Sequence, residues 1–243
     1  MIRARLRALL TICVVAVVAV VLIAAISHRA PAPLPPRAPN ERPVLLLLTS
    51  LPLMFGEEFS LEQNGSPALK TLGTRYRVVP ISVTDRAELA KGTLLLMAQP
   101  QAQPAEDLVV LDTWVRRGGR ALILADPMLE WPSERPLGDP LRPPAMFADT
   151  GLLAHWGMRL DAPDQRGIEQ RELGGYHVAT MSPGSLFGKC EIASDRLVAH
   201  CRIGRGKATV VADADLLDPS RLGRGASHNL DAVLKELAAL EQK

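Results

Sequence analysis

Three aspartates follow short apolar runs, at positions where a parallel sheet presents its ligand-binding edge. Asp126 follows the run at 120–125, and Asp213 and Asp215 follow the run at 207–212. The carboxyl ends of parallel strands meet at one edge of an open α/β sheet, where ligands bind. Paired carboxylates there can hold a metal or act as acid and base. The alternative is that each aspartate caps the turn or helix after its strand.

Other sequence signatures of catalysis are absent. The chain contains no G-x-S-x-G elbow and no H-E-x-x-H pair, and no further His or Glu at ligand spacing supports a metal site. The run GRGK (204–207) lacks the upstream glycine and the following Ser or Thr of a phosphate-binding loop, and it precedes a strand. We therefore predict no metal, no cofactor and no Walker-type ATP hydrolysis.

Two cysteines are predicted to face each other across a hairpin. A turn at Asp195-Arg196 sets Cys190 directly opposite Cys201. Such cross-strand pairs come near disulfide distance at a non-hydrogen-bonded site. An exported location allows oxidation. We therefore expect a structural disulfide, with two free buried thiols as the alternative.

The N-terminus predicts where the protein sits. Residues 8–27 carry no charge and almost no polar side chain, which matches the roughly 20 apolar residues of a membrane-spanning helix. The tail 1–7 holds three arginines, which favour a cytoplasmic N-terminus. We expect a single-pass protein of the bacterial inner membrane whose C-terminal domain is periplasmic. A cleaved signal peptide is the alternative, and it also exports the remainder.

The rest of the chain divides into a linker and one domain. Residues 28–43 are rich in proline and predict an extended spacer that holds the domain clear of the membrane. Residues 44–243 are long enough for one α/β domain. The net charge of +2 belongs to the N-terminal region, because 23 basic residues face 26 acidic ones from Glu41 onward. We therefore predict no nucleic-acid binding through charge.

Alternating apolar runs and amphipathic stretches predict an α/β fold. The expected strands are 44–49, 75–82, 93–98, 120–125 and 207–212, and the expected helices are 67–73, 104–117, 150–156 and 230–240. Short pieces at 176–181, 186–192 and 197–202, separated by turn residues, indicate antiparallel strands. The pattern predicts a three-layer sandwich with a mostly parallel sheet and an antiparallel appendage.

Several stretches resemble one family. The segment 93–127 reads as an apolar strand, a polar loop, a helix ending in Gly-Gly and a strand ending in Asp-Pro. The segment 204–217 supplies a glycine turn, a strand and a D-x-D end, and Asn229 precedes a closing helix. This order resembles the auxiliary domain of uncharacterised ABC-type transport systems, the GldG-like family. The resemblance covers most of residues 43–240.

The resemblance implies a glutamine-amidotransferase-like, flavodoxin-like fold without amidotransferase chemistry. The elbow that carries a nucleophilic cysteine in active relatives reads Met97-Ala98-Gln99-Pro100 here. We therefore expect a non-catalytic binding or scaffold subunit that works beside an ABC permease and ATPase. The sequence predicts one N-terminal membrane span, whereas members of the family generally carry several transmembrane helices. This difference favours an accessory subunit. A divergent envelope hydrolase that uses Asp126, Asp213 and Asp215 is the alternative function.

The loops at the strand carboxyl ends are the expected binding surface. They comprise residues 50–66, 99–103, 127–149 and 213–228, presented by a rigid sheet. Asp126, Asp213, Asp215 and Asn229 are the candidate binding residues. Leu51, Leu53, Met54 and Phe55 form either an apolar interface patch or part of the core.

Overall fold

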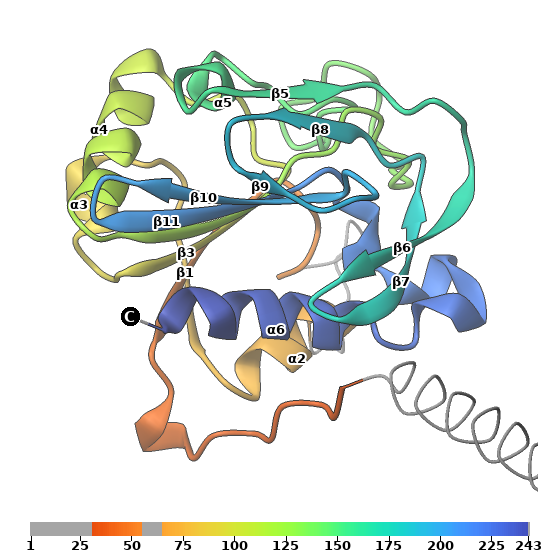
Figure 1. Ribbon diagram of the computed structural model, residues 1–243, viewed down its shortest axis with the longest axis horizontal. Coiled ribbons are helices and arrows are strands. Elements are labelled where there is room, and N and C mark those ends of the chain that lie inside the picture. Colours follow the sequence, from red (N-terminus) through yellow and green to blue (C-terminus); the bar gives the residue numbers. More distant parts are fainter. Residues whose placement is uncertain (1–30, 55–64, 243) are drawn as a thin grey trace, which may run out of the picture. The chain divides into compact units, whose positions relative to one another are not determined.

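A seven-stranded sheet forms the centre of the domain (Figure 1). The computed structural model describes residues 31–54 and 65–242, and Pro33–Lys243 form one compact unit. The strands in sheet order are β2 (Arg77–Pro80), β1 (Val44–Thr49), β3 (Leu94–Ala98), β4 (Arg120–Leu124), β11 (Gly206–Val211), β10 (Val198–Ile203) and β9 (Glu191–Ile192). The first five run parallel, and β10 and β9 are antiparallel additions. The mostly parallel α/β fold predicted from the sequence is confirmed.

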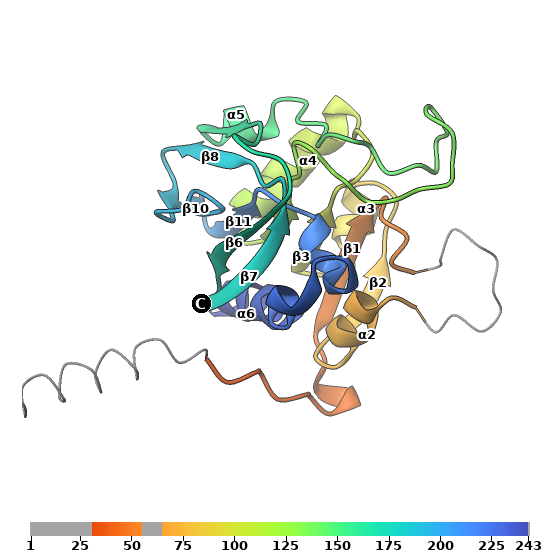
Figure 2. The same ribbon diagram turned by 90° about the vertical axis from the view of Figure 1, so that its right-hand side faces the viewer.

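The central strands are buried on both faces because helices cover the sheet on two sides. On one side lie α2 (Pro67–Gly73) and α6 (Asn229–Glu241), and on the other lie α3 (Arg86–Leu89) and α4 (Ala105–Arg116) (Figures 1 and 2). Continuous leucine and isoleucine runs suit such strands, since neither face meets water. These layers leave the loops at the strand ends as the accessible edges of the sheet.

Local capping fixes where the helices begin. The Ser66 hydroxyl accepts the Leu69 N–H at 3.1 Å at the start of α2. The Asp85 carboxylate accepts the Glu88 N–H at 2.7 Å at the start of α3. The sequence patterns did not predict this helix. These are N-caps, which satisfy amides that have no partner within the helix.

The antiparallel appendage is larger than the sequence predicts. β5 (Met158–Asp161) pairs with β8 (Ser185–Gly188), and β6 (Ile168–Leu173) pairs with β7 (Tyr176–Met181). A short helix, α5 (Leu152–His155), precedes β5. Neither β5 nor β6 was predicted from the sequence. The sequence of β6, IEQREL, is mostly polar, and only its last residue is buried. A polar two-stranded ribbon lacks the apolar run that identifies a buried strand.

The register of β9 on β10 confirms the predicted hairpin pairing. Glu191 lies opposite His200, and Ile192 lies opposite Ala199. Continued by one residue, this register brings Cys190 to Cys201. The structure joins these two cysteines in a disulfide with a Cα–Cα distance of 4.8 Å.

Part of the proline-rich segment is docked on the domain. We name residues 34–42 the strap. Leu34 packs against the core, and the Arg37 backbone N–H donates to the Thr74 carbonyl at 3.0 Å. The Arg37 guanidinium donates two hydrogen bonds to the Glu241 carboxylate, at 2.7 and 3.1 Å, and the Tyr76 hydroxyl donates to the same group. The strap therefore differs from the expected free spacer, because ion-pair and apolar contacts hold it.

The predicted membrane span at residues 8–27 lies outside the described residues. Within the part of the chain that the structure describes, no helix is long and apolar enough to cross a membrane.

Candidate functional site

The carboxyl ends of β4 and β11 bring three aspartates together. These strands are parallel neighbours, so Asp126 and Asp213 emerge side by side from the same edge of the sheet. Asp215 begins the 3-10 turn Asp215–Leu217 (η2) two residues later. All three residues are fully buried, each with an exposed fraction of 0%.

Both carboxylate oxygens of Asp126 and of Asp213 accept backbone N–H groups. Asp126 links the end of its own strand to the end of β11, and Asp213 links β11 to β7 and to η2. The donors, at 2.7 to 2.9 Å, are the amides of Met128, Ala214, Met181 and Leu216. These two aspartates therefore join loops that are distant in the sequence.

Asp215 is held by a different set of groups. One carboxylate oxygen accepts the Glu130 N–H at 2.8 Å, and the other accepts the Arg221 guanidinium at 2.9 Å. Arg221 also donates to the Glu130 carbonyl. Glu130 and Arg221 were not predicted from the sequence, because neither stands beside an apolar run or in a recognisable motif.

Burial dominates the electrostatics of this cluster. It raises the pKa of Asp126 from its ordinary 3.8 to about 7, with the Asp215 charge adding to the effect. Burial, and then the charges of Asp126 and Asp215, raise the pKa of Asp213 well above its usual range. The pKa of Asp215 is also raised by burial, although Arg221 and the Glu130 amide oppose this.

The geometry of the aspartates fits loop fixation better than catalysis. Every carboxylate oxygen of the three has a protein donor, and no part of the residues reaches solvent. A general acid or base has to lie within hydrogen-bonding reach of its substrate. Among residues 31–54 and 65–242, no three His, Cys, Asp or Glu side chains are grouped to hold a metal ion. The capping interpretation therefore explains each of these side chains.

Asn229 is likewise a buried connector. It is the first residue of α6, and its exposed fraction is 0%. Its side-chain amide accepts the Ala179 N–H at 3.0 Å and donates to the Ala179 carbonyl at 2.7 Å. A further hydrogen bond, at 3.2 Å, reaches the Leu216 carbonyl. Asn229 thus pairs with a residue of β7 as a neighbouring strand would.

The elbow after β3 has a strained backbone but no nucleophile. Gln99 has a φ of 42°, a conformation that is rare for residues other than glycine. Its buried side chain donates to the carbonyls of Asp126 and Pro144 and accepts the Asp126 N–H. Ser182, at φ 48°, is a second buried residue of this kind, and its hydroxyl donates to Glu130. A polar residue directly before proline was the available sequence signal for both.

The loop 128–149 presents apolar side chains at the same edge of the sheet. Leu137, Leu141 and Met146 are 86%, 67% and 68% exposed. Figure 2 shows the green segment projecting from the body. The loop is nevertheless pinned, because the Gln101 side chain donates to the Pro140 and Arg142 carbonyls. The structure thus holds an exposed apolar surface in a defined conformation.

The other expected apolar patch is not an exposed surface. Leu51 and Leu53 are buried in the core, with exposed fractions of 3% and 0%, and Met54 is half-buried. Phe55 lies outside the described residues. The core alternative therefore accounts for Leu51 and Leu53.

Comparison with solved structures finds one reported chain with a TM-score above 0.5. The N-terminal domain of mmIFT52 aligns with a TM-score of 0.55 at 14% identity, covering 82% of this chain and 98% of that one. An exo-β-1,4-mannosidase from an Opitutaceae bacterium gives a TM-score of 0.47 at 15% identity, covering 84% of this chain and 36% of the mannosidase. The chain thus spans about a third of that enzyme. A cytoplasmic protein of Salmonella typhimurium, STM3548, gives 0.46 at 12% identity, covering 82% and 98%. No curated protein matched the chain.

A family match gives the identity of the domain. The sequence model of a family described as ABC-type uncharacterized transport system matches residues 42–164. This range begins just before β1 and includes the Gln99 elbow, Asp126 and the apolar loop. Because the match covers half of the sequence, the chain belongs to the family of auxiliary components of ABC-type uncharacterized transport systems.

Proposed function

We propose that this protein is a membrane-anchored, extracytoplasmic subunit that binds and positions components of an ABC-type transport system without catalysing a reaction. The family membership supports association with such a system. The expected anchor at 8–27, preceded by arginines, supports a periplasmic domain at the inner membrane. The GldG-like relationship and the amidotransferase-like fold stay predictions.

A contrast between buried polar groups and an exposed apolar loop supports the non-catalytic role. The polar groups at the carboxyl edge of the sheet are buried and bonded to the protein itself, whereas the apolar loop beside them is exposed. Leu137, Leu141 and Met146 would lose contact with water if a partner covered them, which stabilises a complex. The loop 128–149 is therefore the proposed docking surface for the permease, and the ATPase would associate through the permease.

The alternative of an envelope hydrolase retains one favourable observation. A pKa of about 7 would suit Asp126 as a general acid. Its two oxygens, however, accept the Met128 and Ala214 amides, and it is not exposed. Substrate access would require the loops to separate, which argues against this role.

Co-purification from native membranes in mild detergent tests the proposal. We expect the tagged full-length protein to retain an ABC permease and ATPase. Full burial of one large apolar side chain is worth about 1.5–3 kcal/mol. Replacing Leu137, Leu141 and Met146 by serine should therefore weaken retention by about tenfold or more.

Exposed apolar residues away from the loop provide a matched control. Val109 and Ile168 are 67% and 52% exposed, and their replacement by serine should leave retention unchanged. Circular dichroism of each variant checks that the fold is intact. Absence of permease and ATPase from the wild-type preparation, or equal retention by the loop and control variants, would contradict the proposal.

A further inference from the structure

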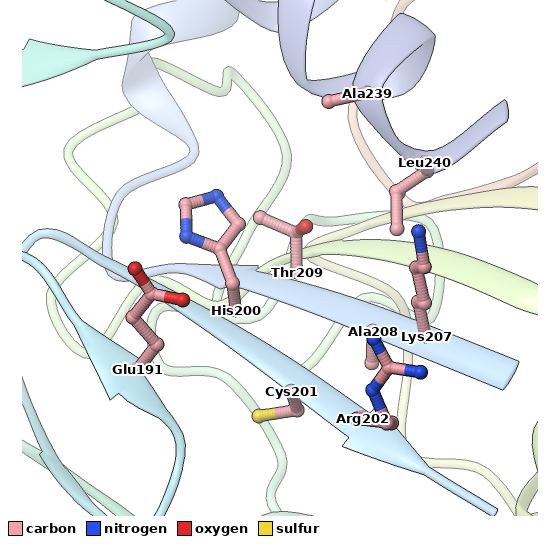
Figure 3. Close-up of a pocket in the computed structure, with 9 residues that line it drawn as sticks. All are labelled: Glu191, His200, Cys201, Arg202, Lys207, Ala208, Thr209, Ala239 and Leu240. Atoms are coloured by element: carbon pink, nitrogen blue, oxygen red, sulfur yellow. The ribbon is translucent and has the colours of Figure 1, made fainter. Parts of the chain in front are cut away.

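A hollow of about 260 Å³ lies on the face of the β10–β11 hairpin, beside the C-terminal end of α6 (Figure 3). The hollow opens between strands β10 and β11 and helix α6. It is therefore a different place in the fold from the loop 128–149. Polar side chains from both strands line it, namely His200, Arg202, Lys207 and Thr209. The apolar side is Ala239 and Leu240 of α6.

Two cations meet at one end of this hollow. Arg202 of β10 lies directly opposite Lys207 of β11 in the antiparallel register. Like charges in that arrangement are destabilising. The Lys207 ammonium donates to the Gln242 carbonyl at 3.0 Å, so its position is explained by this hydrogen bond at the end of α6. The Arg202 guanidinium makes no hydrogen bond or ion pair with any other residue that the structure describes, so its position needs another explanation.

The remaining polar groups give the hollow a positive end and a neutralised end. His200 contacts the Glu236 carboxylate at 2.8 Å, and Glu191 lies opposite His200 on β9. Figure 3 shows Glu191 beside His200 and away from Lys207. The Thr209 hydroxyl stands on the same side of the sheet as Lys207 and has no hydrogen-bond partner among the described residues. A guanidinium, an ammonium and a hydroxyl therefore line one face of the hairpin, and Glu191, the carboxylate that lines the hollow among the described residues, lies at the His200 end.

We propose that this hollow binds a phosphate group, with Arg202, Lys207 and Thr209 as donors. Guanidinium groups bind phosphate through two parallel hydrogen bonds, and lysine adds a point charge. The phosphate could belong to an anionic lipid headgroup or to a soluble phosphate. Only the lipid source rests on the membrane anchoring proposed above.

Hydrogen exchange of the full-length protein in lipid nanodiscs tests the site. The readout is amide exchange in the peptide that covers residues 198–211. Three conditions are compared: phosphatidylcholine alone, phosphatidylcholine with phosphatidylglycerol, and phosphatidylcholine with inorganic phosphate. We expect phosphatidylglycerol or inorganic phosphate to slow exchange in this peptide, and 0.5 M NaCl to reverse the effect.

Paired variants separate this site from general charge effects. Each cation near an anionic surface contributes about fivefold to affinity, so replacing Arg202 and Lys207 by glutamine should weaken the response about 30-fold. The variant Arg166→Gln/Arg224→Gln removes the same charge from exposed arginines elsewhere and should respond as wild type.

The outcomes decide the proposal and its ligand source. Protection by phosphatidylglycerol alone identifies a lipid headgroup, and protection by inorganic phosphate identifies a soluble ligand. No protection in either condition, or equal protection in both paired variants, would overturn the proposal. No permease is present in these samples, so a failure here is distinct from a failure of co-purification.

Discussion

The buried aspartate cluster predicts that the protein loses stability as pH rises through neutrality. The pKa of Asp126 is raised from 3.8 to about 7 on folding, so the folded state binds a proton more tightly than the unfolded state does. Stability is then fully retained below pH 3.8 and falls as pH rises, until it levels above pH 7. Linkage gives a loss on the order of 2–3 kcal/mol between pH 5 and pH 8. For a domain of this size, that corresponds to a drop in melting temperature of about 5–10 °C.

The assay is thermal unfolding of the full-length protein in nonionic detergent, followed by tryptophan fluorescence from pH 5 to pH 8. Asp126→Asn removes the titrating group and one of its two hydrogen-bond acceptors. We expect this variant to be less stable than wild type at pH 5, since an amide N–H loses its partner. The difference in the free energy of unfolding between the two proteins should shrink by about 2–3 kcal/mol toward pH 8.

Other titrating groups make the matched comparison necessary. The pKa of His200 is raised by its hydrogen bond with Glu236, so it also removes stability as pH rises. The difference between wild type and Asp126→Asn removes the His200 contribution and reports Asp126 together with its effect on the pKa of Asp213. Asp164→Asn at an exposed position serves as control. A wild-type melting temperature that is constant or rises from pH 5 to pH 8, or an unchanged pH dependence in Asp126→Asn, would refute this reasoning.

Three further predictions concern stability and can be measured by urea unfolding or hydrogen exchange. Gly206→Ala should lower the free energy of unfolding by about 3 kcal/mol, because its Cβ would lie 2.0 Å from the Val115 carbonyl oxygen. Gly73→Ala is the control: its Cβ would meet nothing within 4 Å, and the substitution should stabilise the protein slightly. Cys190→Ser/Cys201→Ser should lower the free energy of unfolding by about 3 kcal/mol, and reductant should then have no further effect. Glu241→Gln should speed amide exchange in the strap while costing about 1 kcal/mol or less overall; unchanged exchange would contradict the docked strap.

Sequence patterns predicted the parallel core well because burial there leaves a local signature. The leucine run 45–48 and the run 94–98 are apolar at every position, as expected of strands whose two faces are both covered by helices. The hairpin register at Cys190 and Cys201 was also local information, since one turn at Asp195-Arg196 sets it. These features needed no knowledge of distant contacts.

The polar connections could not be predicted, because they join segments that meet only in the folded chain. The β7 partners of Asp213 and Asn229 lie 32 and 50 residues away along the chain, and nothing in either local sequence indicates them. Proline content predicted an extended spacer at residues 28–43 but carries no information about the Glu241 carboxylate that holds Arg37. The strand-end aspartates were located from sequence, and their burial was not.

The strap also sets the path by which force enters the domain. A pull on the chain from its N-terminal side acts first on the contacts at Arg37 and Leu34, and reaches β1 only after these have separated. Because Arg37 is bonded to Glu241 at the end of α6, the first load falls on the closing helix of the fold. The contacts of the strap would therefore have to separate before a pull from the N-terminal side could act on β1.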